Sequence, residues 1–314
     1  MTGLASVRSM PAVVDGALRW SLLIAIGFLA AVNVFMASLQ IAEILLGSDA
    51  LDWQTYVLAG ERFWTGTLYE QAESWYGWRY SPLAALPFVA LAPLGETIWR
   101  VLLLASLLAL PRRLIFLALA SYPLWFAIHA GSLMVPVAVA AFWALRGRWW
   151  AVGAFLVLAL LIPRPLMVPI VIWILWKEPR WRIPFGVLFL VHLGLVVASG
   201  YLDDWMQALI STGGEEIGSV FNVAPSAIIG PTWLLLAIPL ALWAFRARRP
   251  ALAGLLIQPY WLPYYLLILL ADPLPSRSWW RDHLPLTFTS KVGWFRLPHR
   301  ADEGAAAPQA AAPG

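Results

Sequence analysis

Long apolar runs, interrupted by short basic clusters, constrain the fold of this chain more than any other feature. The first run extends from Leu18 to Leu46. It is longer than the about 20 residues that a helix needs to cross a bilayer, and too long for the apolar region of a cleavable signal. Because a backbone in lipid must satisfy its own hydrogen bonds, such runs predict helices. The sequence therefore predicts an all-α, polytopic membrane protein.

Composition excludes several other classes of protein. Of the 314 residues, 61% are hydrophobic and 12% are charged, whereas a soluble domain is about half apolar and about a quarter charged. These proportions exclude a soluble globular enzyme and an intrinsically disordered protein. The chain has no cysteine, which excludes disulfides, thiolate catalysis and Cys-ligated metals.

The charges are distributed unevenly between the connections of these runs. Four basic clusters occupy short connections, and the positive-inside rule places them, with the N-terminus, in the cytoplasm. Acidic residues occupy two long segments, about 48–80 and about 200–225, which we expect to be extracytoplasmic loops. The net charge of +4 therefore reflects topology and indicates no nucleic-acid partner. The clusters are Arg112 with Arg113, Arg146 with Arg148, Lys177 with Arg180 and Arg182, and Arg246 with Arg248 and Arg249.

The apolar runs predict about nine or ten transmembrane helices. The run at about 81–110 contains Pro87 and Pro93; counting it as one net crossing keeps all four basic clusters cytoplasmic. That count leaves the chain after residue 272 outside, unless a break at Pro259 or Pro263 returns it. The expected spans are about 19–46, 81–110, 113–128, 132–145, 149–162, 165–176, 183–199, 226–245 and 251–271.

Three parts follow along the chain. We expect a multi-span transmembrane domain over 1–275, a basic, Trp-rich juxtamembrane segment over 276–300 and a disordered Ala/Pro-rich tail over 301–314. The absence of cysteine and the excess of Arg over Lys are compatible with a bacterial inner membrane.

The first acidic loop holds the main candidate for chemistry. Residues 52–64 have a helical pattern with Trp53, Tyr56 and Gly60 on one face, which predicts a juxtamembrane helix. Asp52 lies just beyond the outer end of the first span. Capping of this helix by Asp49 or Asp52 is a sufficient structural reason for an acid there. The alternative is that Asp52 is a functional carboxylate.

Several short segments over about 45–271 occur in a recognisable order. Asp52 and Tyr56 precede Ala59-Gly60 and Gly66-Thr67-Leu68-Tyr69, then Tyr80-Ser81-Pro82 enters a helix and Ala92-Pro93-Leu94 follows. Later come His129-Ala130-Gly131-Ser132-Leu133, Pro163-Arg164-Pro165, Asn222-Val223-Ala224-Pro225-Ser226, and Gln258-Pro259-Tyr260-Trp261 with Tyr264-Tyr265. This order resembles the polyprenol-phosphate-mannose-dependent α-mannosyltransferases, which are similar to glycosyltransferase family 87 and have the GT-C fold. The chain departs from them where Ser81 stands for Pro, Arg164 for Lys, and Tyr264-Tyr265 for His.

The resemblance implies transfer of a mannose-like sugar from a polyprenyl-phosphate donor to a lipid or glycan acceptor at the extracytoplasmic face. It implies inversion at the anomeric carbon, with Asp52 as the base and with neither a cofactor nor a metal. Arg164 suits the donor phosphate because arginine binds phosphate bidentately; snorkelling to the interface is its structural alternative. His129 and Arg79 are further phosphate candidates, and His129 is otherwise a structural hydrogen-bonding residue. The candidates for donor or acceptor contacts are Asp49, Tyr56, Tyr80, Asn222, Tyr264 and Tyr265.

Two other functions stay open from the sequence. A lipid or polysaccharide transporter requires ionisable residues within its spans; here Glu43, Glu96, Arg100 and His192 are the few examples. A non-catalytic GT-C-derived partner in envelope assembly would tolerate the departures from the family pattern. Membrane lipids are partners in every case, and the oligomeric state stays open.

Overall fold

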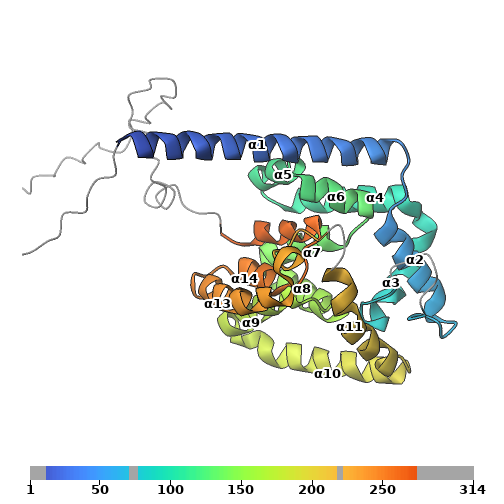
Figure 1. Cartoon of the computed structure of the whole chain (residues 1–314). Helices are drawn as coiled ribbons and strands as arrows, with labels where there is room; N and C mark the ends of the chain where they lie inside the picture. Colours follow the sequence, from blue (N-terminus) through green and yellow to red (C-terminus); the bar gives the residue numbers. More distant parts are fainter. Residues whose placement is uncertain (1–11, 71–76, 218–221, 274–314) are drawn as a thin grey trace, which may run out of the picture. The chain divides into compact units, whose positions relative to one another are not determined.

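The computed structural model describes residues 12–70, 77–217 and 222–273, and within these ranges the chain contains helices and no β-strand (Figure 1). Residues Trp20–Leu274 form one compact unit. A second unit comprises Met1–Arg19 and Pro275–Gly314, and of it only residues 12–19 are described, as the first turns of a helix. The predicted juxtamembrane segment over 276–300 and the tail over 301–314 lie outside the described residues.

The helices follow one another through short connections. The α-helices are α1 (Ala12–Leu45), α2 (Leu51–Phe63), α3 (Leu86–Leu91), α4 (Gly95–Ser106), α5 (Arg112–Leu119), α6 (Tyr122–Ala130), α7 (Met134–Ala144), α8 (Trp149–Leu161), α9 (Val168–Lys177), α10 (Arg182–Ala198), α11 (Leu202–Ile217), α12 (Ser226–Ile229), α13 (Trp233–Arg246) and α14 (Pro250–Ile257). The 3₁₀ helices are η1 (Pro82–Ala85), η2 (Ala92–Leu94), η3 (Leu107–Ala109), η4 (Pro165–Met167), η5 (Pro179–Trp181), η6 (Gly230–Thr232) and η7 (Pro263–Ala271).

Three helical stretches in the described part of the chain are long and apolar enough to cross a membrane. They are Trp20–Leu45, Pro82–Ala109 and Pro179–Ala198, and the bent pair α5 and α6 makes a fourth if it is one span. The all-helical prediction is thus confirmed, whereas three or four full-length candidates replace the predicted nine or ten. Several other apolar helices have only 10–17 residues. An 11-residue helix such as α7 extends about 16 Å, about half the thickness of a bilayer core.

Breaks in the helices follow the prolines and the basic clusters. The Pro82–Ala109 stretch counts as one candidate span by length and composition. It consists of η1, α3, η2, α4 and η3 in succession, and its backbone leaves the helical conformation at Gly95, where φ is +76°. The expected span at 251–271 is divided, because α14 ends at Ile257 and η7 begins at Pro263. The second acidic segment, expected to be a loop between spans, contains the 16-residue helix α11, whose apolar positions recur at helical spacing.

The buried centre of the unit is α7. All its residues except Pro136 and Trp143 are buried, and it packs against α8 and η7. Its many alanines allow this close approach of helices. The long helices differ: α1 and α10 expose large apolar side chains, including Phe28, Phe35 and Leu190. Exposed apolar surface of this extent marks a face that contacts lipid or another protein.

Candidate functional site

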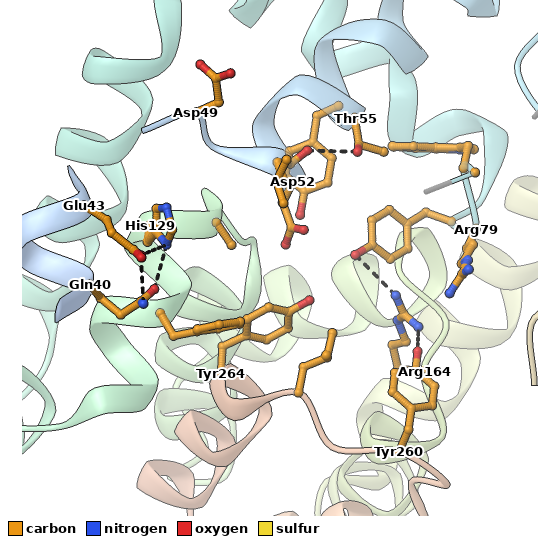
Figure 2. A pocket seen from close by; sticks show the side chains of 18 residues that line it. Gln40, Glu43, Asp49, Asp52, Thr55, Arg79, His129, Arg164, Tyr260 and Tyr264 are labelled. Atoms are coloured by element: carbon orange, nitrogen blue, oxygen red, sulfur yellow. Dashed lines mark hydrogen bonds and ion pairs between the residues drawn. The ribbon is translucent and has the colours of Figure 1, made fainter. Parts of the chain in front are cut away.

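A cavity of about 410 Å³ lies inside the Trp20–Leu274 unit (Figure 2). Its walls come from α1, α2, α6, the segment before η1, the connection between α8 and η4, and the segment between α14 and η7. The structure thus brings together residues separated by more than two hundred positions. Eight predicted site residues line the cavity: Asp49, Asp52, Tyr56, Arg79, Tyr80, His129, Arg164 and Tyr264.

Asp52 projects from the first turn of α2 into the middle of this cavity. The N-cap of α2 is Ala50, with no side-chain hydrogen bond to the helix end, so the predicted capping by Asp49 or Asp52 is wrong. Two neighbours on the same helix anchor it: Trp53 stacks on Trp99 with ring centroids 5.1 Å apart, and Tyr56 stacks on Phe88 at 4.6 Å. The apolar face of α2 is therefore buried, and this burial aims Asp52 at the cavity.

The Asp52 carboxyl is poised for proton transfer. Burial raises its pKa from 3.8 to about 6, while the Ser132 hydroxyl, the Arg164 charge and the Tyr264 hydroxyl act to lower it. Its Oδ2 atom is buried and has no hydrogen-bond partner among the described residues. A carboxyl with a pKa close to neutrality is an efficient general base. Asp52 also lines the cavity, so its carboxyl lies next to the space that a bound hydroxyl would occupy.

The turn between α6 and α7 closes around Asp52. Gly131 has φ +75°, and a Cβ on it would lie 3.0 Å from the Trp53 Cβ and 3.2 Å from the Ala50 Cβ. Only glycine suits this backbone shape at such close range. The turn also places the Leu133 N–H where it donates to the Tyr56 hydroxyl at 3.3 Å. It therefore carries His129 and Ser132 to the cavity region next to α2.

Arg164 occupies the opposite side of the cavity from α1, framed by tyrosines (Figure 2). Its Nη1 donates to the Tyr260 hydroxyl, and its Nη2 donates to the Tyr80 hydroxyl at 3.4 Å. The guanidinium carbon also lies 5.1 Å from the Tyr80 ring centroid and 5.9 Å from that of Tyr265. Cation–π contact at these distances favours the charged group. Tyr265 does not line the cavity. Its hydroxyl donates to the Tyr260 hydroxyl at 3.4 Å and so supports the position of Tyr260 beside Arg164.

The backbone after Arg164 is held in place by contacts with α14 and with Gln258, the residue that follows α14. The Leu166 N–H donates to the Gln258 side-chain oxygen at 3.2 Å, and Gln258 is fully buried. A Cβ on Gly254 would lie 1.9 Å from the Leu166 carbonyl oxygen, so the two backbones meet where no larger residue fits. These contacts fix η4, and with it the position of Arg164.

A hydrogen-bonded cluster from α1 and α6 forms the other end of the cavity. The His129 Nδ1 lies 2.6 Å from the Gln40 Oε1 and 3.3 Å from the Glu43 Oε2, and the Gln40 Nε2 donates to the same Glu43 oxygen at 3.0 Å. The His129 carbonyl oxygen accepts from Arg100 at 3.1 Å. His129 is thus far from the tyrosine cluster, and the structure does not unite it with Arg164 as one phosphate site (Figure 2).

Two predicted residues have different surroundings from those expected. Asn222 does not line the cavity; its Oδ1 accepts from the Ala224 N–H at 2.9 Å and from the Trp261 N–H at 3.0 Å. It therefore shapes the segment that leads to Tyr264. Asp49 lines the cavity mouth and is exposed, with its carboxylate directed away from Asp52 (Figure 2).

Sequence reasoning missed Gln40, Glu43 and Tyr260 as cavity residues. Gln40 and Glu43 lie three positions apart on one face of an apolar helix, and polar residues within an apolar run are themselves a signal of function. Tyr260 belongs to the same aromatic segment as Tyr264, but its contact with Arg164 depends on the tertiary fold. Within the described ranges, no group of three or more His, Cys, Asp or Glu residues could hold a metal ion.

Comparison of the chain with protein-family models, curated proteins and solved structures yields no match. The residues of the cavity are therefore the basis for inferring a function.

Proposed function

We propose that this chain is a membrane glycosyltransferase of GT-C-like architecture. It would move a sugar from a polyprenyl-phosphate donor to a hydroxyl of a lipid or glycan acceptor, at the extracytoplasmic face of a cell membrane, with its N-terminus in the cytoplasm. The resemblance described above suggests a mannose-like sugar. The observation that carries the proposal is that one cavity contains both a buried carboxylate, Asp52, and an arginine framed by tyrosines, Arg164.

The reaction needs one base and one anion site. The acceptor hydroxyl gives its proton to Asp52 as its oxygen forms a bond to the anomeric carbon. The bond from that carbon to the phosphate oxygen breaks, and its electron pair leaves with the polyprenyl phosphate. The acceptor and the leaving group occupy opposite faces of the carbon, so the configuration inverts. General-base catalysis of this kind is worth about 10²–10⁴-fold in rate.

Arg164 and its tyrosines suit the departing phosphate. A guanidinium keeps its charge when it is partly buried and matches phosphate oxygens with two N–H groups. The Tyr80 and Tyr260 hydroxyls accept hydrogen bonds from Arg164, so each directs its own O–H elsewhere. Both residues line the cavity. An anion there would meet one guanidinium and two hydroxyl donors, which is the kind of fixed stabilisation that favours developing charge.

The surroundings of the cavity suit a lipid-linked substrate. A volume of about 410 Å³ lies in the range of small-molecule sites. One wall belongs to α1, which is also a candidate membrane span with exposed apolar side chains. The acyl part of a lipid-linked substrate can therefore lie along an apolar helix while its headgroup enters the cavity.

A transfer assay with matched aspartate variants tests the proposal. Purified wild type in liposomes receives a panel of polyprenyl-phosphate sugars and a lipid extract as acceptor, beside Asp52→Asn and Asp203→Asn. Asp203 is an exposed acid in the first turn of α11 and does not line the cavity, so it matches Asp52 in helix position alone. We expect transfer by the wild type and by Asp203→Asn, and loss with Asp52→Asn. Well-folded wild type that transfers none of the sugars would favour the non-catalytic partner instead.

A further inference from the structure

The charged groups of the cavity are separated into two ends. Arg79 and Arg164 lie at one end with the tyrosines, and Glu43 lies at the other with Gln40 and His129 (Figure 2). Asp52 lies between them. A ligand that spans the cavity therefore meets positive charge at one end and a carboxylate at the other. Its two ends must differ in charge.

The cluster of Gln40, Glu43 and His129, here called the α1 cluster, is built as a polar unit in an apolar helix. Gln40 is buried, with 8% of its surface exposed, although a buried amide in such a helix is costly unless it has partners. Its partners are Glu43 on the same helix face and His129 from α6. The side chain of Glu43 is 49% exposed, so the carboxylate is held in place while it remains accessible to a ligand.

The chemistry of the α1 cluster matches hydroxyl groups. A carboxylate accepts hydrogen bonds, an amide both accepts and donates, and a neutral imidazole has one donor and one acceptor nitrogen. Neighbouring hydroxyls of a sugar or polyol offer the same mixture of donors and acceptors. A phosphate offers acceptors only, and its charge is repelled by the carboxylate of Glu43, which lines the cavity.

We propose that the α1 cluster binds a neutral, polyhydroxylated acceptor and discriminates against an anionic one. This inference rests on the proposed function and deepens it by naming the acceptor class. An acceptor held there has a hydroxyl directed at Asp52, while the donor phosphate occupies the Arg164 end. The neutral headgroup of a glycolipid and a free glycan share this chemistry.

Binding can be tested without turnover. Saturation-transfer NMR with the purified protein in nanodiscs compares methyl glucoside with methyl glucoside 6-phosphate while saturating polyprenyl phosphate occupies the Arg164 end. Octyl glucoside, below its micelle concentration, distinguishes a lipid-linked source from a free one. We expect wild type to bind the neutral glycosides at least tenfold more tightly than the phosphorylated one. Glu43→Gln should lower the ratio of the Kd for the phosphorylated glycoside to the Kd for the neutral glycosides at least threefold. His129→Gln should weaken the binding of the neutral glycosides. The control, Glu61→Gln, changes an exposed acid of α2 that does not line the cavity and should behave as wild type.

The outcomes separate this inference from the proposed function. Equal binding of neutral and phosphorylated glycosides by wild type overturns the inference, and so does a ratio that is the same in Glu43→Gln and wild type. Either result can coexist with transfer activity, in which case only the acceptor class is wrong. A neutral preference that depends on Glu43, in a protein that transfers no sugar, supports the binding site and contradicts the glycosyltransferase.

Discussion

The two ends of the cavity differ in how firmly the fold holds them. At the Arg164 end, Tyr260 and Tyr265 are buried, and Gln258 and Gly254 lock the following backbone in place. At the α1 cluster, the Glu43 and His129 side chains are 49% and 22% exposed, and the hydrogen bonds within the cluster join side chains of two helices. A rigid anion site stabilises charge without reorganising, whereas a more exposed polar cluster can adapt to several hydroxyl patterns.

Substitution of Asp52, which lies between the two ends of the cavity, should have the largest effect on the transfer rate. Asp52→Asn should lower transfer by about 10²–10⁴-fold, and wild-type transfer should fall as the pH drops below about 6, since the protonated Asp52 cannot act as a base. Initial rates between pH 5 and pH 8 measure both. A flat profile for wild type would show that a group other than Asp52 takes the proton.

The same substitution should stabilise the fold. Because the pKa of Asp52 is raised in the folded state, its protonated form is favoured there, and stability falls as the pH rises from about 4 to about 6 and stays low above that. At pH 7 the ionised carboxylate costs roughly 3 kcal/mol, less any screening by water in the cavity. We therefore expect Asp52→Asn to raise the Tm in detergent at pH 7 by more than it does at pH 4. An equal shift at both values would contradict the raised pKa.

The rigid end should be sensitive to a single methyl group. Gly254→Ala places a Cβ 1.9 Å from the Leu166 carbonyl oxygen, so α14 or η4 must move, at a cost of about 3 kcal/mol. Thermal unfolding of the purified protein measures the loss. Gly194→Ala on α10 is the control, because no heavy atom lies within 4 Å of its added Cβ, and it should be neutral or slightly stabilising. Equal effects of the two substitutions would mean that α14 and η4 are not in such close contact.

A charge-preserving change tests the geometry of the anion site. Arg164→Lys retains the positive charge but loses the planar guanidinium, whose two nitrogens donate separately to Tyr260 and Tyr80. We expect the Kd for the polyprenyl-phosphate donor to rise about tenfold, or roughly 1.4 kcal/mol, with the binding of neutral glycosides unchanged. Arg180→Lys, where the side chain is 64% exposed, should leave both ligands unaffected. A Kd that does not change in Arg164→Lys would reduce the role of Arg164 to its charge.

Local sequence patterns predicted the positions of helices more accurately than the number of helices that are long enough to span a membrane. The helix expected over 52–64 is α2 and the run expected over 149–162 is α8, whereas the span expected over 251–271 is divided between α14 and η7. Prolines, glycines and basic clusters mark these ends in the sequence itself. Whether a short apolar helix crosses a bilayer or is buried among others is decided by tertiary packing, as α7 shows, and hydropathy alone does not distinguish the two.

The site was predictable where one segment carried several of its residues. Asp52 and Tyr56 lie on one helix. Tyr80 precedes Ser81-Pro82, and Arg164 lies between Pro163 and Pro165, so local features of the sequence indicate these residues. The pairing of Gln40 and Glu43 with His129 joins residues about ninety positions apart, and no local pattern encodes it. Asn222 does not line the cavity, and its contact with Trp261, 39 residues later, is likewise not encoded by a local pattern.

The contact between Arg164 and Tyr260 spans 96 residues, and this separation has a consequence for biosynthesis. At about 5–20 residues per second, the ribosome makes Tyr260 roughly 5–20 s after Arg164. During that interval Tyr80 is already present, but the guanidinium has no Tyr260 to accept its other hydrogen bond, and solvent or other polar groups must take that place. Nascent chains that end before residue 260 can therefore insert their first helices, yet the anion site forms only when the last helical segments have been synthesised.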